Sequence, residues 1–248
     1  MTTPGTPPQP SAPHAAGPAT PFQKLLRAQR VWDVALPAFD PAGAPADPLS
    51  LFHAWFAEAV AAGQAEPHTM GLATVAEDGG PDVRTVVLHD ADGRGWHFAS
   101  HASSRKGRQL AARPEAALHF YWASRGRQIR IRGRVTTAPH AESLADLHAR
   151  STGALAAALV GRQSEPLSSC DELARASAAA WDRARAEPDA DAPTWTLYVL
   201  EPVEAEFFQG DERRRHVRLR YRRDQGQGQN QGRGAAAAGE WTRELLWP

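Results

Sequence analysis

A succession of short strand-like segments, each bounded by a turn, constrains this fold more than any other feature of the chain. The segments are rich in β-branched and aromatic residues, and Gly, Asp or Pro stands between them. They are MGLATVAE, VRTVVLHD, GWHFAS, EAALHFYWA, RQIRIRGRVTTA, WTLYVLEPVEAEFFQG, RHVRLRYRRD and EWTRELLWP. Alternating apolar residues in RQIRIRGRV predict a strand with one solvent-facing side. About seven or eight strands with helices inserted between them predict an α+β fold built on a small β-barrel.

Helical patterns interrupt this series of strands. The first follows Asp47, which suits an N-cap, with Pro48 at the first helical position and Gly63 as a stop. Its apolar stripe comprises Leu51, Phe52, Trp55, Phe56 and Val60. A short helix is predicted in SSRKGRQLAARP, and residues 140–161 and 169–187 are also expected to be helical.

The ends of the chain differ in composition from its middle. Residues 1–21 hold seven prolines and few large apolar residues, so we expect a disordered tail. Residues 22–46 are expected to form an arm and a linker. Residues 47–248 are expected to form a single domain, in which the low-complexity stretch 225–239 is a loop.

Composition excludes several classes of protein. The 28 basic residues balance 28 acidic ones, which argues against a general nucleic-acid binder. The single cysteine, Cys170, cannot form a disulfide within the chain and argues against a Cys-based metal site, so no metal is expected. No apolar run reaches the roughly 18 residues of a membrane span, and the first residues lack the features of a signal peptide. We therefore expect a cytoplasmic protein without a membrane partner.

The stretch Phe98–Leu110 combines hydroxyl and cationic side chains where a strand gives way to a helix. Ser103 and Ser104 precede the adjacent cations Arg105 and Lys106. Together with free N–H groups at a helix start, these side chains would bind an anion and suit a phosphate. A solvated loop is the alternative interpretation.

Other polar residues stand at strand ends. Arg84 opens the apolar segment RTVVLH, which ends in His89, and such a charge needs a partner unless it faces water. Gln128 follows a tight turn, where its amide could contact a polar ring edge. Gln163 and Ser164 follow the helical stretch 140–161.

The run QGDERRRHVRLRYRR holds seven arginines between residues 213 and 223. If it is a strand, Arg214, His216, Arg218 and Arg220 share one face. Such a row suits an anionic small ligand at least as well as an RNA, because few aromatic residues interleave with it.

Taken together, these pieces resemble the pyridoxamine 5′-phosphate oxidase family of flavoenzymes. The resemblance covers residues 47–248 in the family's order. Its motifs are DPLSLF, RTVVLH, FASHASSRKGRQ, RQIRIRGRV, the segments around HAR and GRQS, EFFQG followed by RRRHVR, and the closing LLWP.

The resemblance implies a split β-barrel of antiparallel strands that forms a homodimer with flavin mononucleotide (FMN) at the subunit interface. Gln163 and Ser164 would belong to the partner subunit's share of the site. Phe208 stands where the family usually has Trp, which keeps an aromatic wall but removes an N–H donor. The implied cofactor-binding residues are Arg84, Thr85, Val86, Val87, Leu88, Ala99, Ser100, Arg105, Lys106, Gln128, Gln163, Ser164, Phe208 and Arg218.

The implied substrate site departs from the family. The family binds the substrate phosphate with a Lys, a Tyr, an Arg and a Ser, and the matching positions here are His89, Asp146, Arg150 and Ala154. Asp146 would repel a phosphate dianion, and only the Arg is retained. Arg214 and His216 match the family's Arg-x-His pair, which implies catalytic residues that also contact substrate.

Four hypotheses follow. The first is the family reaction, in which pyridoxamine or pyridoxine 5′-phosphate gives up a hydride from C4′ to FMN, oxygen is reduced to hydrogen peroxide, and pyridoxal 5′-phosphate forms, as in pyridoxine biosynthesis. The second is an FMN oxidoreductase with a different small substrate that need not carry a phosphate. The third is a non-catalytic flavin-binding protein, and the fourth is an Arg-rich nucleic-acid binder; no nucleic acid is expected as a partner.

Overall fold

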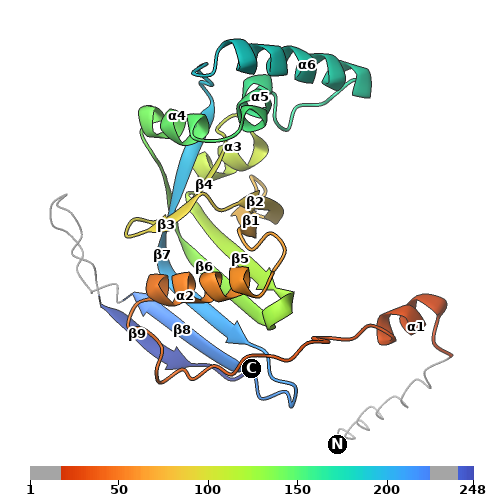
Figure 1. The fold of residues 1–248 in the computed structure, drawn as a ribbon, viewed down its shortest axis with the longest axis vertical. Helices are drawn as coiled ribbons and strands as arrows, with labels where there is room; N and C mark the ends of the chain where they lie inside the picture. The colour runs from red at the N-terminus through yellow and green to blue at the C-terminus, as the bar shows by residue number, and fades with distance from the viewer. Residues whose placement is uncertain (1–17, 224–239) are drawn as a thin grey trace, which may run out of the picture.

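The computed structural model describes residues 18–223 and 240–248, which form a curled antiparallel sheet with helices packed on and around it (Figure 1). The strands are β1 (Thr69–Val75), β2 (Pro81–Val87), β3 (Asp90–Asp92), β4 (Gly95–His101), β5 (Glu115–Trp122), β6 (Arg127–Thr137), β7 (Trp195–Gln209), β8 (Val217–Arg223) and β9 (Trp241–Leu245). The helices are α1 (Pro21–Arg27), α2 (Pro48–Ala61), α3 (Arg105–Ala112), α4 (His140–His148), α5 (Thr152–Val160) and α6 (Cys170–Ala186), with a 3-10 turn at Ala123–Arg125. The predicted α+β class with antiparallel strands is confirmed.

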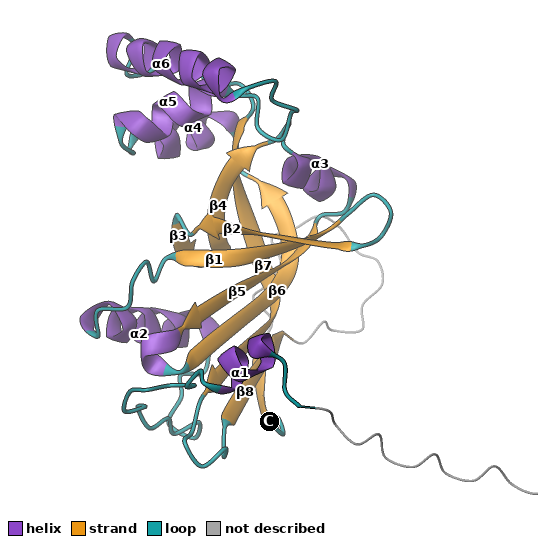
Figure 2. Cartoon of the chain, turned by 90° about the vertical axis from the view of Figure 1, so that its right-hand side faces the viewer, coloured by secondary structure: helices purple, strands orange, loops and turns teal. Residues whose placement is uncertain are grey.

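The sheet has the order β2-β1-β5-β6-β7-β4-β3, and β8 and β9 extend it beside β7. The long strand β7 connects the part of the sheet that contains β4 to the part that contains β8. Its first residues, Trp195–Leu200, pair with β4, whereas Glu204–Gln209 pair with β8. The strands change direction strongly across the sheet (Figure 2), as the right-handed twist of successive strands requires.

The main core lies between α2 and the concave face of this sheet. Asp47 caps α2 by accepting a hydrogen bond from the backbone N–H of Ser50 at 2.8 Å, as predicted. Phe52 contacts the rings of Trp96 and Phe120, with centroid distances of 5.5 and 5.2 Å. Burial of such aromatic side chains, at roughly 1.5–3 kcal/mol each, holds the helix on the sheet. Val60, which the sequence pattern places on the buried stripe, is exposed.

A second core joins α4, α5 and α6 at one end of the molecule (Figure 1). Leu147, Leu155 and the small residues Ala156, Ala180 and Ala184 form it, so the helices approach closely. The predicted helical stretch 140–161 is two helices. Ser151 separates them because its side chain caps the N–H of Ala154 and starts a new helix.

Three features of the strands differ from those predicted. Arg84 lies in the middle of β2, a half-exposed edge strand that begins at Pro81, so it does not head a buried strand. The short β3 pairs with β4 and was not expected. β8 begins only at Val217, and Arg214, with φ of 63°, lies in the preceding turn. Arg214 and His216 therefore do not share a strand face with Arg218.

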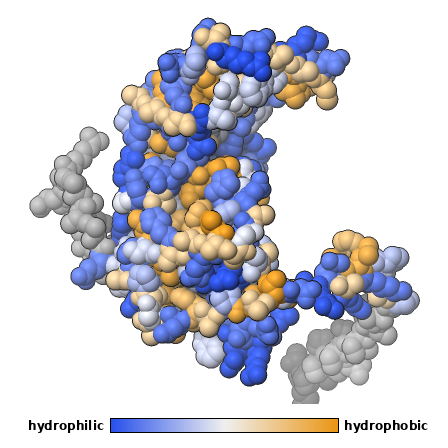
Figure 3. Space-filling view, viewed as in Figure 1, coloured by the Kyte–Doolittle hydropathy of each residue, from blue (hydrophilic) through white to orange (hydrophobic). Residues whose placement is uncertain are grey.

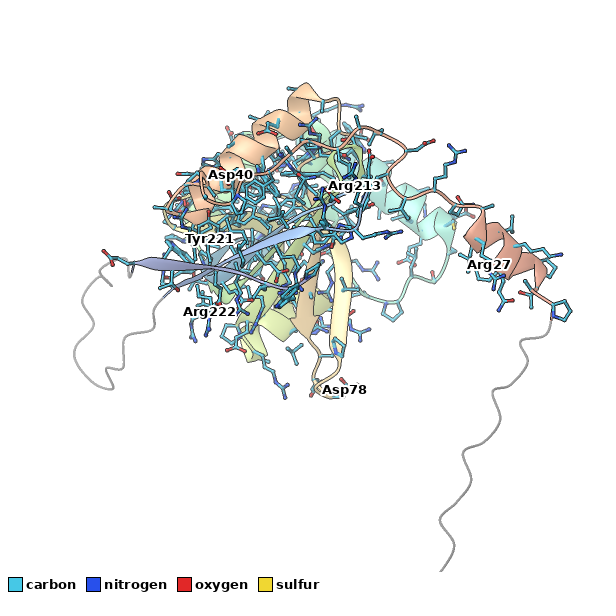
Figure 4. The ribbon with its side chains drawn as sticks, turned by 90° about the horizontal axis from the view of Figure 1, so that it is seen from below. Arg27, Asp40, Asp78, Arg213, Tyr221 and Arg222 are labelled. Carbon is cyan, nitrogen blue, oxygen red and sulfur yellow. The ribbon has the colours of Figure 1, made fainter. Side chains whose placement is uncertain are left out.

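The N-terminal arm begins with α1, whose first turn is closed by a capping box between Thr20 and Gln23. None of the residues of α1 is buried, and the helix stands apart from the sheet, with Arg27 far from the main body (Figure 4). Residues 1–17 of the predicted tail and the predicted loop 225–239 lie outside the described residues.

The molecule is hollowed on the side where α6 and the arm project, and apolar residues lie within the hollow (Figure 3). Among the helices that the structure describes, none has both the length and the apolar character required to cross a bilayer.

Candidate active site

A first cluster of polar side chains surrounds the junction between β4 and α3. Ser104 caps α3 by accepting a hydrogen bond from the N–H of Gly107 at 3.1 Å. Any residue larger than glycine at position 107 would clash, because its Cβ would lie 2.4 Å from the carbonyl oxygen of Ala102. The helix start is thereby pressed against the strand end, and Arg105 and Lys106 occupy its first turn.

Lys106 is the buried cation of this cluster. Its Nζ donates to Ser100 Oγ and to Gln163 Oε1, both at 3.1 Å. Burial, and then the nearby charge of Arg84, lower the pKa of the Lys106 ammonium. A buried ammonium whose described hydrogen-bond partners are neutral oxygens fits a ligand that brings its own negative charge.

Arg84 and Arg105 lie beside a carboxylate, Asp82. Their nitrogens are 2.7 and 3.1 Å from Asp82 Oδ2. A hydrogen bond from Gln109 lowers the pKa of the Asp82 carboxyl, despite partial burial, and the charges of the two arginines lower it further. Arg84 also donates to Thr74 Oγ1 at 2.5 Å. The arginines are therefore held in place before any ligand binds.

The charge of the cluster suits a phosphate. Arg84, Arg105 and Lys106 supply three positive charges, and Asp82 contacts two of them. The excess of two charges matches a phosphate monoester dianion, and hydroxyls of Ser100 and Ser164 lie beside it. The donor set that the resemblance implies for the FMN phosphate thus fits that group chemically.

Gln163 and Ser164 contact residues of the same chain, whereas the resemblance assigned them to the partner subunit's share of the site. Gln163 Oε1 accepts from Ser100 Oγ at 2.9 Å, and Ser164 Oγ accepts from the backbone N–H of Arg105 at 3.2 Å. A segment some 60 residues downstream closes over the start of α3. The sequence alone does not reveal this contact, because the two segments lie far apart in the chain.

The remaining residues of the predicted cofactor set on this side are backbone positions of two strands. Thr85, Val86 and Val87 lie on β2, at the edge of the sheet, and Leu88 follows directly. Ala99 lies on β4 beside Leu197. Edge-strand backbone groups that face away from the sheet are free to contact a ligand.

A second cluster lies at the far end of β7. Gln128 on β6 is opposite Phe208, which is opposite Arg218 on β8. Two nitrogens of Arg218 bind Glu206 Oε1 at 2.8 and 2.7 Å, and a third donates to the carbonyl oxygen of Trp247. His216 packs on Phe208 with a centroid distance of 5.1 Å. Its Nδ1 accepts the N–H of Asp211 at 3.0 Å, so the neutral ring carries its proton on Nε2.

A third cluster joins His89 to α4. His89 Nδ1 is 2.8 Å from Asp146 Oδ2, and Arg150 Nε is 3.5 Å from the same oxygen. Burial alone would raise the pKa of Asp146, but the hydrogen bond and charge of His89, together with Arg150, lower it overall. The Ala154 side chain offers no hydrogen bond. The candidate phosphate contacts of the substrate site are therefore already paired with a protein carboxylate.

Comparison with known proteins decides the family. Residues 56–184 match the family model described as pyridoxamine 5′-phosphate oxidase, and residues 195–248 match the pyridoxine 5′-phosphate oxidase C-terminal dimerisation region. The chain belongs to the pyridoxamine 5′-phosphate oxidase family. The resemblance drawn from its motifs is confirmed, and with it membership of a family of oxidases.

Curated relatives of this oxidase family share about two residues in five with the chain. The pyridoxine/pyridoxamine 5′-phosphate oxidase of Rubrobacter xylanophilus is 41% identical over 72% of this chain and 82% of its own length. The protein of the same name from Salinibacter ruber is 40% identical over 82% of this chain and 89% of its own length.

Two solved structures resemble this family member. PhzG from Burkholderia lata 383, in complex with tetrahydrophenazine-1-carboxylic acid, has a TM-score of 0.74 and 30% identity, covering 88% of this chain and all of that one. A pyridoxamine 5′-phosphate oxidase-related, FMN binding protein from Nostoc punctiforme has a TM-score of 0.60 and 20% identity, covering 84% of this chain and all of that one. The curled sheet is the split barrel of these proteins, as predicted.

The clusters of this family member do not all lie together in the described chain. His101, close to the first cluster, pairs with Trp195 at the start of β7, whereas Phe208 lies near the end of that strand. The two positions are thirteen residues apart along β7, which places them at most roughly 40 Å apart at about 3.3 Å per residue. The first and third clusters lie toward the α3–α6 end, and the second lies beside β8 (Figure 1).

Several residues of the first cluster were missed by sequence reasoning. Thr74, Asp82 and Gln109 form its inner hydrogen-bonded layer, with Thr74 Oγ1 2.6 Å from Gln109 Oε1. Gln109 stands four residues after Arg105, which places both on one helix face, so this spacing was an available signal. Thr74 and Asp82 meet the cluster only because β1 and β2 pair.

Proposed function

We propose that this protein is an FMN-dependent oxidase in which the first cluster binds the FMN phosphate. The buried ammonium of Lys106 and the excess of positive charge around Asp82 support this assignment. Ser100, Gln163 and Ser164 would complete the shell of hydrogen bonds around the phosphate and ribityl end. Gln128, Phe208 and Arg218 would contact the flavin ring or its neighbourhood.

We propose that the active site is completed by a second copy of the chain. The two clusters expected to bind one FMN molecule lie at opposite ends of β7. The match of residues 195–248 to a dimerisation region and the hollow side of the molecule support a homodimer (Figure 3). The first cluster of one subunit would then meet the second cluster of its partner, as a two-fold axis permits.

Bound FMN would supply a hydride acceptor that dioxygen reoxidises, with release of hydrogen peroxide. The protein residues would bind and orient the substrate. His216 holds its Nε2 proton at a defined position through the Asp211 contact, and it would donate to the substrate at that atom. Arg214 supplies a cation two residues away, in a turn whose backbone conformation sets it apart from β8.

The pairing of Asp146 with His89 carries our assignment of the substrate class. A carboxylate at this position repels a phosphate dianion and neutralises the charge of Arg150. Loss of several charge-assisted hydrogen bonds, each roughly 1.5–3 kcal/mol, would weaken phosphate binding by orders of magnitude. We therefore propose a substrate without a phosphate, bearing at most a single negative charge.

The similarity to PhzG from Burkholderia lata supports this choice. That protein binds tetrahydrophenazine-1-carboxylic acid, a reduced ring system with a carboxylate and no phosphate. A partly reduced ring can lose a hydride and a proton to regain aromaticity, which suits a hydride acceptor. A ring carboxylic acid of this kind is the substrate class that we propose.

Oxidation of pyridoxamine or pyridoxine 5′-phosphate is the second candidate function. The curated relatives with that name, at 40–41% identity, support it, as do the retained Arg150, Arg214 and His216. In this case Arg150 would have to leave Asp146 for the substrate phosphate.

Anaerobic mixing of the FMN-loaded protein with each compound separates these functions. The flavin absorbance band at roughly 450 nm is followed. Bleaching by tetrahydrophenazine-1-carboxylic acid but not by pyridoxamine 5′-phosphate is the expected result. Prompt bleaching by pyridoxamine 5′-phosphate alone would favour the second candidate, and failure to bind FMN at all would refute the cofactor assignment.

A further inference from the structure

An N-terminal strap, residues 28–46, leads from α1 to α2 across the β7–β8 end of the sheet (Figure 1). It is fixed at its far end, where Tyr221 donates from its hydroxyl to the carbonyl oxygen of Pro45 at 2.8 Å. In its middle, Phe39 packs edge-on against Trp55 with a centroid distance of 5.0 Å. The strap is therefore part of the folded body, unlike α1.

Near its start the strap places Trp32 on the second cluster. The indole lies edge-to-face with the His216 imidazole, at a centroid distance of 5.4 Å and an interplanar angle of 79°. It also packs against the Phe208 ring, at a centroid distance of 6.3 Å. Three aromatic rings thus pack against one another, and the plane of His216 is set by the two others.

The backbone around this contact is adapted to it. Trp32 has φ of 56°, a conformation that is rare for a bulky residue and persists where packing enforces it. Gly210 leaves the space that the indole occupies, since a Cβ there would lie 2.9 Å from the Trp32 ring. The unusual backbone conformation of Trp32 and the missing side chain at Gly210 together allow the indole to occupy this position.

The indole N–H of Trp32 is buried, yet it has no hydrogen-bond partner among the described residues. Buried donors are nearly always satisfied, and an exception needs an explanation. A ligand acceptor bound beside His216 would provide one.

We propose that Trp32 is a positioning and specificity residue of the oxidase. Its ring holds the His216 imidazole in the orientation used for proton transfer, and its N–H donates to an acceptor on the substrate, such as a carboxylate or ring nitrogen. This inference rests on the proposed function, which places His216 at the reacting substrate.

The first test measures His216 directly and needs no substrate. In FMN-loaded protein with isotope-labelled histidine, the His216 ring signal is assigned by its loss in His216→Asn. Trp32→Ala is expected to shift and broaden this signal, whereas Trp32→Phe, which keeps a ring, shifts it less. Trp181→Phe, a change on exposed α6, serves as the matched control. An unchanged His216 signal in Trp32→Ala overturns the positioning role.

The second test measures the rate of flavin reduction by tetrahydrophenazine-1-carboxylic acid and by pyridoxamine 5′-phosphate. With whichever compound reduces the wild type, Trp32→Ala is expected to lower the rate constant on the order of 10²-fold when both proteins are saturated with FMN. Trp32→Phe is expected to raise the substrate dissociation constant about tenfold with a smaller change in rate, because it removes only the donor. Equal kinetics in wild type and both variants refute the proposal. If neither compound reduces the wild type, the substrate assignment fails, while the His216 signal still decides the positioning role.

Discussion

His89 Nδ1 lies 2.8 Å from Asp146 Oδ2, joining the end of β2 to α4 across 57 residues of sequence. The pair occupies positions at which the family resemblance implies contacts to a substrate phosphate. Restoring the family's residues there should therefore restore phosphate binding.

The triple variant His89→Lys, Asp146→Tyr, Ala154→Ser is expected to bind pyridoxamine 5′-phosphate at least tenfold more tightly than the wild type. It removes one carboxylate and adds charge-assisted hydrogen bonds of roughly 1.5–3 kcal/mol each. Perturbation of the flavin spectrum on titration reports the affinity. Asp182→Asn, on exposed α6, is the control. Equal affinities would show that the pair does not select against phosphate.

Removal of the buried ammonium should release the cofactor. Lys106→Met is expected to weaken FMN binding by about 10- to 150-fold, since a charge-assisted contact of roughly 1.5–3 kcal/mol is lost. Fluorescence titration of free FMN measures the dissociation constant. Arg175→Met removes a cation from an exposed position of α6 and should leave it unchanged. FMN binding as tight as in the wild type would place the phosphate elsewhere.

FMN binding should also weaken at alkaline pH. Burial lowers the pKa of Lys106 below its usual value of 10.5, so the ammonium loses its proton at a lower pH than an exposed lysine. The favourable charge is present below the lowered pKa and is lost as the pH rises through it. Dissociation constants measured between about pH 7 and 10 test this. Lys106→Arg, whose guanidinium stays charged, should show a much smaller alkaline decline; parallel curves would assign the decline to another group.

A methyl group at Gly107 should disturb the start of α3. The added Cβ would lie 2.4 Å from the carbonyl oxygen of Ala102, so the helix must move, at a cost of about 1–3 kcal/mol. Gly107→Ala is expected to lower the unfolding free energy by this amount and to weaken FMN binding. Chemical denaturation and FMN titration check both effects. Gly93→Ala, where the Cβ meets nothing within 4 Å, is the matched control.

Mixing two variants, at an FMN concentration that fills the wild-type site but leaves the Lys106→Met site empty, tests whether the site is shared between subunits. Lys106→Met damages the first cluster and His216→Asn the second. If each site takes one cluster from each subunit, random mixed dimers restore about a quarter of the sites, because half the dimers are mixed and each has one intact site. Turnover after joint refolding measures this. Activity that stays at the level of the separate variants would mean that both clusters act within one subunit.

Local sequence signals predicted the strands and α2 well. Alternation in β6 and the Asp47-Pro48 start of α2 depend on residues close in sequence, and both are observed. Strand boundaries were predicted less accurately where the conformation of a turn sets them. Arg214, with its positive φ, lies in such a turn, and β8 begins only after it. No periodicity argument detects such a turn.

The sequence by itself determined the succession of strands, the polar and cationic strand-to-helix junction at Ser104–Lys106 and, through its motifs, the family. Each depends on local chemistry or on the order of short motifs. Tertiary structure alone decided that Asp82 and Thr74 support Arg84, that Gln163 reaches Lys106, and that Trp32 covers His216. These contacts join segments far apart in the chain, and only the packing of the curled sheet and the strap determines which of them meet.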